Sequence, residues 1–266
     1  MTVPHELRAD QVSLGYDAGP VVTDLDLRIP PEQVTVIVGA NGCGKSTLLR
    51  GMARLLQPVS GQVLLDGQSV HTRPARQVAK LLGILPQTPV APEAITVADL
   101  VARGRYPHQH WFRQWTATDE AAVTGALVRT DTLHLADREM DSLSGGQRQR
   151  VWIAMALAQD TGVLLLDEPT TFLDVAHQLD VLDLLRSLNA ERGTTVVMVL
   201  HDLNLAARYA DHLVVMHAGR VQATGTPADV VTPAVVQEAF ALTAQVIDDP
   251  VTGTPMVVPV SRAPQP

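Results

Sequence analysis

The pattern of apolar and polar positions along the chain predicts strands first and helices next. Residues 21–29 alternate between apolar and polar side chains, and residues 34–38 form the continuous apolar run of a buried strand. A helix should follow this run, because apolar residues then recur at helical spacing. These apolar residues are Leu48, Leu49, Met52, Leu55 and Leu56. Residues 61–70 are predicted to form a hairpin with Asp66 and Gly67 at its turn, and residues 82–86 a short strand.

Strand patterns stop near residue 87, and helical spacing replaces them up to about residue 159. Strands then return in alternation with helices. Beyond residue 159 we expect strands at residues 163–167 and 194–200, helices at residues 175–192 and near residues 203–210, and hairpins at residues 212–223 and 244–259, the last with Pro250 and Gly253 in its loop. This order predicts an α/β fold with a mostly parallel sheet and an inserted helical part.

Composition narrows the possible functions. With 266 residues, 46% of them hydrophobic, the chain can bury a large core. A formal net charge of −8 and an aromatic share of 3% argue against a nucleic-acid partner, which needs clustered cations or stacking rings. The single cysteine, Cys43, excludes an internal disulfide and favours a reducing compartment. Neither a signal peptide nor an apolar run of membrane-spanning length is found, so we expect a soluble chain whose membrane role depends on a partner.

Residues 39–46 match the phosphate-loop pattern GxxxxGK[ST] and lie between an apolar strand and an amphipathic helix, the context that this pattern requires. Glycines let backbone N–H groups close around a β-phosphate, Lys45 can reach the β- and γ-phosphates, and the Ser46 hydroxyl can bind Mg²⁺. Cys43 is interpreted as a small residue without a role in this chemistry. The candidate ATP-binding residues are Gly39, Asn41, Gly42, Gly44, Lys45, Ser46 and Thr47.

Further candidates lie where predicted strands end. Asp167 and Glu168 close an apolar strand, so Asp167 could hold Mg²⁺ and Glu168 could act as the general base toward water. His201 follows the next strand and could hydrogen-bond a γ-phosphate, and Gln87 could bind Mg²⁺ or water. The alternatives are an acidic pair that caps a helix, a structural histidine and a surface glutamine. Tyr16 could stack on adenine or pack in the core.

Residues 143–147, Leu-Ser-Gly-Gly-Gln, precede a helical pattern and would form a second anion site from helix N–H groups, without a lysine. The phosphate loop, Gln87, this loop, the acidic strand end and His201 occur in the order found in ATP-binding subunits of ABC transporters. The sequence resembles these subunits over nearly its whole length.

The resemblance implies an ABC nucleotide-binding domain: a P-loop NTPase core with a mostly parallel sheet, an N-terminal antiparallel β part and an inserted α-helical subdomain. It divides the chain into four parts. These are residues 1–87 (core with phosphate loop), 88–159 (helical signature subdomain), 160–240 (second part of the core) and 241–266 (C-terminal hairpin and tail).

The resemblance also accounts for the second loop. In this family two nucleotide-binding domains form a head-to-tail dimer, and ATP lies between the phosphate loop of one and the LSGGQ loop of the other. Ser144 and Gly146 would therefore contact the γ-phosphate of ATP bound to the partner copy, within a loop that Gly145 and Gln147 complete. Asp174 would cross to the other subunit.

Residues 103–109, 170–185 and 247–259 are similar to those of iron-chelate importers, most of all the ferric-enterobactin type, although Ala40 stands where proline is common. This implies an ATPase that powers ferric siderophore import. Permease subunits would hold it at the cytoplasmic face of the inner membrane, and an extracytoplasmic siderophore-binding protein would deliver the cargo. The same role in a vitamin B12 or haem importer is the alternative, and a soluble ABC ATPase and a P-loop kinase represent other classes.

Aromatic residues gather in the predicted helical insertion, within residues 104–115. The resemblance to importers implies that they line a groove that receives the permease, and the alternative is that they pack the helical subdomain. The residues concerned are Tyr106, Trp111, Phe112 and Trp115.

Overall fold

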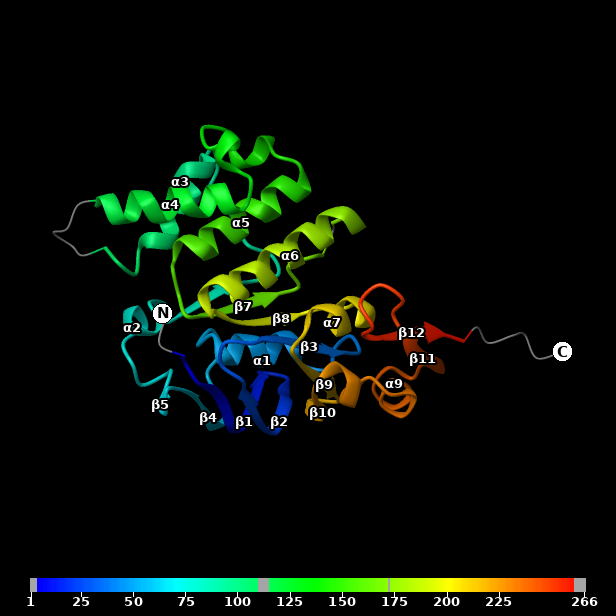
Figure 1. The fold of residues 1–266 in the computed structure, drawn as a ribbon. Helices are drawn as coiled ribbons and strands as arrows, with labels where there is room; N and C mark the ends of the chain where they lie inside the picture. The colour runs from blue at the N-terminus through cyan, green and yellow to red at the C-terminus, as the bar shows by residue number, and fades with distance from the viewer. Residues whose placement is uncertain (1–3, 110–114, 172, 261–266) are drawn as a thin grey trace.

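The computed structural model describes residues 4–109, 115–171 and 173–260. Its central layer is a six-stranded sheet with the order β10-β9-β3-β8-β7-β6 (Figure 1). Every neighbouring pair is parallel except β10 with β9. The strands are β3 (Val34–Gly39), β6 (Leu82–Leu85), β7 (Val163–Asp167), β8 (Thr195–Val199), β9 (His212–His217) and β10 (Arg220–Gly225). The predicted mostly parallel sheet is therefore confirmed.

A second, antiparallel sheet has the order β2-β1-β4-β5 and covers helix α1 (Lys45–Met52) on the side away from the central sheet (Figure 1). Its strands are β1 (Leu7–Tyr16), β2 (Gly19–Ile29), β4 (Ser60–Leu65) and β5 (Gln68–Ser69). Leu48, Leu49 and Met52 of α1 are fully buried between the two sheets. Asp66 and Gly67 both have positive φ at the β4–β5 turn, as a tight two-residue hairpin requires.

The helix after the phosphate loop is shorter than predicted. Leu55 and Leu56 were expected on its buried face, but α1 ends at Met52 and Leu55 is 61% exposed. The cause is the backbone beyond the helix, where Arg54 has a φ of 65° and the N–H groups of Leu55 and Leu56 both donate to the Arg50 carbonyl. A residue in this left-handed conformation ends a helix and turns the chain away from its axis.

The predicted helical insertion is present between β6 and β7. It contains α3 (Val97–Ala102), α4 (Ala117–Arg129) and α5 (Gly145–Ala158), and a short α2 (Ala75–Ala79) precedes β6. Thr116 and Ser144 start α4 and α5 with reciprocal side-chain caps. Figure 1 shows α3, α4 and α5 gathered above the central sheet, with α6 (Val175–Arg192) between α5 and strands β7 and β8, whereas α2 lies near β5. α5 also contacts β6.

Helix α7 (Leu203–Tyr209) and the hairpin of β11 (Ala244–Asp248) and β12 (Pro255–Pro259) lie where they were predicted. Helices α8 (Pro227–Val230) and α9 (Pro233–Phe240) were not predicted. Asn204 of α7 joins this hairpin to the core, because its side chain donates to the Val257 carbonyl at 3.2 Å and accepts from the Val257 N–H at 2.7 Å. In the described ranges, no helix is long and apolar enough to cross a membrane.

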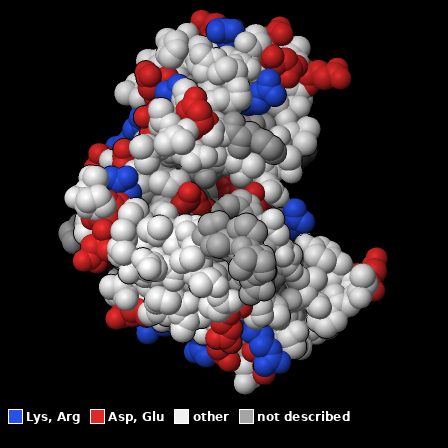
Figure 2. All heavy atoms as spheres, turned by 90° about the vertical axis from the view of Figure 1, so that its right-hand side faces the viewer, with Lys and Arg blue, Asp and Glu red and all other residues white. Residues whose placement is uncertain are grey.

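On the face turned toward the viewer in Figure 2, basic side chains are interspersed with acidic ones. No continuous basic patch covers that face. The pattern fits the acidic balance of the whole sequence.

A buried ion pair holds the helical subdomain together. Arg105 Nε donates to Asp119 Oδ1 at 2.9 Å, and the two side chains are only 5% and 8% exposed. Arg105 also donates to the Ala158 carbonyl at the end of α5, and the Thr116 hydroxyl donates to the other oxygen of Asp119. The Thr116 hydroxyl and the Arg105 guanidinium hold the pKa of Asp119 below its usual value, although burial acts in the opposite direction.

Asp119→Asn should therefore destabilise the protein by about 3 kcal/mol, because it leaves the Arg105 charge buried without its counter-charge. Chemical denaturation at neutral pH measures the change in the free energy of unfolding. Because the folded-state pKa of Asp119 is lowered, the stabilisation from this carboxylate is present above the unfolded pKa and is lost as pH falls through the lowered value. In Asp119→Asn, the free energy of unfolding should lack this part of its dependence on pH.

Asp131→Asn is the matched control. Asp131 lies in the same subdomain, but its side chain is 84% exposed and lies 3.7 Å from Arg150. Its replacement should change stability by less than about 0.5 kcal/mol. Equal effects of the two substitutions would show that the buried pair has no special role.

Candidate functional site

The phosphate loop, residues 39–46, connects β3 to α1 and is shaped by three glycines. Gly39, Gly42 and Gly44 have φ values of 154°, 78° and 103°, which side chains rarely adopt. A Cβ on Gly39 would also lie 2.2 Å from the Met216 carbonyl oxygen of β9. The loop backbone therefore depends on glycine both for its torsions and for its close approach to the sheet.

Lys45, at the start of α1, is 5% exposed, and its ammonium group is held by the loop itself. Nζ donates to the Gly39 carbonyl at 2.9 Å and to the Ala40 carbonyl at 3.0 Å. The charge thus sits inside the curve of the loop, at the positive end of a helix. An anion in the loop would meet this charge together with the backbone N–H groups.

Cys43 is buried in the same loop, and its sulfur lies where a side chain on Gly39 would have to pass. This packing agrees with the interpretation of Cys43 as a small filler of the loop.

Ser46 and Asp167 meet across 121 residues of sequence. The Ser46 hydroxyl donates to Asp167 Oδ1 at 2.8 Å. Asp167 is 2% exposed at the end of β7, and this burial raises its pKa above the usual value, against the opposing effect of the Ser46 hydrogen bond. The negative charge of the neighbouring Glu168 raises it further.

Glu168 is the centre of a hydrogen-bonded cluster. Its backbone has a φ of 54°, an uncommon value for a residue with a side chain, and its carboxylate is 8% exposed. Oε2 accepts from the Gln87 amide at 2.6 Å and from the Thr171 hydroxyl at 3.0 Å, and Oε1 lies 2.6 Å from His201 Nε2. Gln87 and His201, predicted from sequence as separate candidates, therefore converge on one carboxylate.

Thr171 was not among the predicted site residues. Its position three residues after Glu168 places its hydroxyl on the carboxylate, through a turn in which the Thr171 N–H also donates to the Glu168 carbonyl. A hydroxyl at this spacing from an acidic strand end was the available signal, but hydroxyl residues in turns are too common to be singled out.

A cavity of about 420 Å³ joins the phosphate loop to this cluster. It is lined by Val21, Asn41, Gly42, Gly44, Lys45, Ser46, Thr47, Gln87, Glu168 and His201. Most of the nucleotide-binding and catalytic candidates therefore border a single space.

The lining omits Gly39 and Asp167, which belong to the same site, and it also omits three predicted groups that lie elsewhere. Tyr16, at the end of β1, is 48% exposed, and its hydroxyl lies 3.4 Å from an Arg50 nitrogen. Ser144 is the N-cap of α5. Its hydroxyl accepts from the Gln147 backbone N–H, and the Gln147 side-chain oxygen accepts from the Ser144 backbone N–H. Asp174 is the N-cap of α6 and accepts from the His177 N–H and imidazole.

The N–H groups of Gly145 and Gly146 occupy the first turn of α5, where a helix has no internal acceptors for them. The loop can therefore still bind an anion, although its caps are satisfied.

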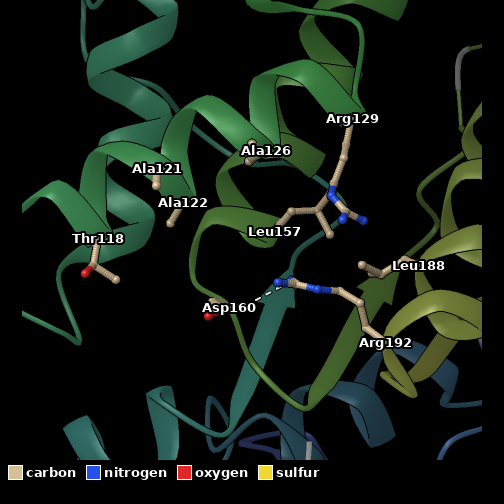
Figure 3. Close-up of a pocket in the computed structure, with 10 residues that line it drawn as sticks. Thr118, Ala121, Ala122, Ala126, Arg129, Leu157, Asp160, Leu188 and Arg192 are labelled. Carbon is tan, nitrogen blue, oxygen red and sulfur yellow. Dashed lines mark ion pairs between the residues drawn. The ribbon is translucent and has the colours of Figure 1, made fainter. Parts of the chain in front are cut away.

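A separate cavity of about 320 Å³ lies between α4 and α6 (Figure 3). Small and apolar residues such as Ala122, Ala126 and Leu188 border it, and Arg129 and Arg192 extend toward it. Arg192 pairs with Asp160 at 3.0 Å. No predicted site residue lines this space, which marks the boundary between the helical subdomain and the core.

Comparison with known proteins identifies the family of the chain. The family model described as "ABC transporter" matches residues 22–171, which is more than half of the chain and includes the phosphate loop, residues 143–147 and the Glu168 cluster up to Thr171. The chain belongs to the ABC transporter family. Its fold is that of an ABC nucleotide-binding domain, and it is an ABC-type ATPase.

Curated relatives cover nearly the whole chain. The achromobactin transport ATP-binding protein of Dickeya dadantii is 54% identical over 252 residues, which are 95% of this chain and 94% of that protein. The ferric enterobactin transport ATP-binding protein of Escherichia coli is 51% identical over 256 residues, 96% of this chain and 93% of that protein.

Solved structures agree with this assignment. An ABC transporter described as of metal-chelate type, in an inward-facing conformation, has a chain that superposes with a TM-score of 0.83 at 29% identity, covering 97% of this chain and 98% of that one. A bacterial ABC transporter cassette solved as a dimer superposes with a TM-score of 0.74 at 28% identity, covering 83% of this chain and 98% of that one.

Lys45→Ala should reduce ATP affinity by at least about tenfold, because charge-assisted hydrogen bonds to phosphate are lost. Equilibrium binding of a fluorescent ATP analogue to the purified chain measures this. The matched control is Lys80→Ala, because Lys80 is the only other lysine of the chain and lies beyond α2, away from the cavity lining. Unchanged affinity in Lys45→Ala would contradict the assignment of the loop.

Proposed function

We propose that this chain is the ATP-hydrolysing subunit of an importer for iron–siderophore complexes. The observation that carries the proposal is the convergence of Gln87 and His201 on Glu168 at the cavity of the phosphate loop. This arrangement is suited to activating water beside a bound triphosphate. The relatives support the cargo, since two of them are named as transport proteins for achromobactin and for ferric enterobactin.

The residues present fit a nucleotide with its Mg²⁺. The loop glycines offer backbone N–H groups, and Lys45 supplies a buried cation. Ser46 and Asp167 place a hydroxyl and a carboxylate 2.8 Å apart next to the loop, a hard-oxygen pair that suits Mg²⁺. Among the described residues no group of three or more His, Cys, Asp or Glu could hold a metal alone, which fits an ion bound mainly through phosphates.

When bound, Mg²⁺ would neutralise charge that develops on the phosphates. The chain's own residues would carry out the remaining work. Lys45 would orient the β- and γ-phosphates, and Ser46 and Asp167 would hold the ion. Glu168 would accept a proton from the attacking water, and Gln87 and His201, already within 2.6 Å of its carboxylate, would hold that carboxylate and the water in line.

The second phosphate loop would act in trans. We assign Ser144, Gly145, Gly146 and Gln147 to the ATP bound by a second copy of the chain, because none of them lines the cavity of its own chain. Asp174 would lie at the same interface, and Tyr16 would stack on adenine. Residues 1–87 and 160–240 would form the core, 88–159 the helical signature subdomain, and 241–266 a C-terminal hairpin and tail.

Permease subunits would hold the ATP-binding dimer at the cytoplasmic face of the inner membrane, and a siderophore-binding protein would act on the opposite side. Tyr106 and Trp115 support a protein-binding surface in the helical subdomain, because they are 60% and 43% exposed. The Trp115 indole donates to Glu120 at 2.7 Å, so that side chain is fixed at the surface. Trp111 and Phe112 lie outside the described residues.

Uptake of radioactive iron tests the proposal directly. Cells that lack this chain should lose uptake of one class of ferric siderophore, and the wild-type chain should restore it. Labelled cobalamin and haem are measured in the same cells. Loss of cobalamin or haem uptake with intact iron uptake would replace the proposed cargo while leaving the ATPase role in place.

Glu168→Gln should keep ATP binding, slow hydrolysis by about a thousandfold or more, and accumulate a closed ATP-bound dimer, because the base is lost while the phosphate contacts stay. Light scattering and single-turnover hydrolysis of the complex with its permease measure both effects. Glu238→Gln, at an exposed position of α9, is the matched control and should behave as wild type. If Glu168→Gln hydrolysed ATP at the wild-type rate, Glu168 could not be the general base.

A further inference from the structure

His177 lies in the first turn of α6, where its imidazole has a fixed direction. Nδ1 lies 2.7 Å from Asp174 Oδ1, and the backbone N–H of His177 donates to the same oxygen at 2.9 Å. These two hydrogen bonds, the backbone one first, hold the pKa of Asp174 below its usual value. The ring is therefore locked to the N-cap of its own helix.

The other side of the ring rests on the signature loop, residues 143–147. A Cβ placed on Gly146 would lie 3.2 Å from His177 Cδ2 and 3.5 Å from Cγ, and the three nearest atoms that it would meet all belong to His177. A Cβ placed on Gly145 would have no atom of another residue within 4 Å, its chain neighbours and own helix backbone aside. Gly146 lies within the helix, so a side chain added at this position would meet the His177 imidazole first, and that ring would have to shift by a few tenths of an ångström.

Two glutamines tie the same region together. The Gln149 amide of α5 donates to the carbonyl of Pro169, the residue after Glu168, at 2.7 Å. The Gln178 amide of α6 donates to the Leu173 carbonyl at 3.0 Å. The segment that leaves the catalytic carboxylate is thus fixed to the signature helix at one end and to α6 at the other.

We propose that His177 is a positioning residue that joins Asp174, which begins α6, to the signature loop through ring packing on Gly146. The inference rests on the proposed function, in which Glu168 serves the ATP of its own chain and Ser144–Gly146 serves the ATP of the partner copy. The packing then couples the position of Asp174 to that of the signature loop. Closure around one nucleotide is then transmitted to the other site.

Replacing the imidazole ring should lower ATP turnover without weakening ATP binding at the phosphate loop of the same chain. His177 borders neither the phosphate loop nor the cavity, so ATP affinity of the isolated chain should not change. A misplacement of about 1 Å in a group that contacts the reacting phosphate can cost up to about a hundredfold in rate. For a loop with one of its supports removed, we expect kcat to fall about tenfold.

Three substitutions separate packing from helix capping. His177→Ala removes both the ring and its Nδ1 hydrogen bond to Asp174, while the backbone N–H bond stays. His177→Phe keeps a ring against Gly146 but loses the Nδ1 bond, and His177→Asn keeps an amide N–H near the place of Nδ1 but loses the ring. Asp180→Ala, an exposed position further along the same helix, is the matched control. Each variant is assembled with the permease, and its thermal midpoint is measured beside its ATPase kinetics.

The expected result is a kcat reduced about tenfold in His177→Ala and His177→Asn, near normal in His177→Phe and in the control, with unchanged ATP affinity of the isolated chains. Rescue by Asn rather than Phe would assign His177 to the helix cap alone and overturn the proposal. Wild-type turnover in all three variants would overturn it as well. Failure of Glu168→Gln to close with ATP is a distinct result, because it would reject the proposed dimer itself.

Discussion

Parallel pairing of four neighbouring strands is the constraint on which the site depends. β3, β8, β7 and β6 are adjacent and run in one direction, so the segments that follow them emerge at one edge of the sheet. The phosphate loop, His201, Glu168 and Gln87 leave these four strands in turn. A shift of one residue in the pairing of a strand would move each of its side chains to the opposite face of the sheet. The packing of both hydrophobic cores makes such a shift unfavourable.

The helical insertion places the second phosphate loop away from that edge. α5 begins at a capped serine with helix N–H groups that lack internal acceptors, while its later residues, among them Val151 and Ile153, pack into the core shared with the central sheet. In the proposed function this loop serves a partner copy, because none of its residues lines the cavity of its own chain. On that proposal ATP would join two copies, and it would therefore favour the closed pair.

The sequence predicted those features that depend on local chemistry or on strong periodicity. Apolar runs located β3, β7 and β8, and glycine and acidic motifs located the phosphate loop and Glu168. Leu55 was misplaced because apolar spacing says nothing about the left-handed turn at Arg54 that ends α1. Contacts between distant segments carry no such pattern, so the Arg105–Asp119 pair and the packing of His177 on Gly146 were visible only in three dimensions.

Each charged group of the site already has a partner within the chain. Lys45 is bound by two loop carbonyls, Asp167 by Ser46, and Glu168 by Gln87, Thr171 and His201. Burial without these contacts would be very unfavourable, since the two carboxylates are adjacent and almost inaccessible. In the proposed function, nucleotide binding would be an exchange of partners, in which phosphate oxygens compete with backbone carbonyls for Lys45. The net affinity would then be the difference between two states in which Lys45 has partners, and so smaller than the new contacts alone would give.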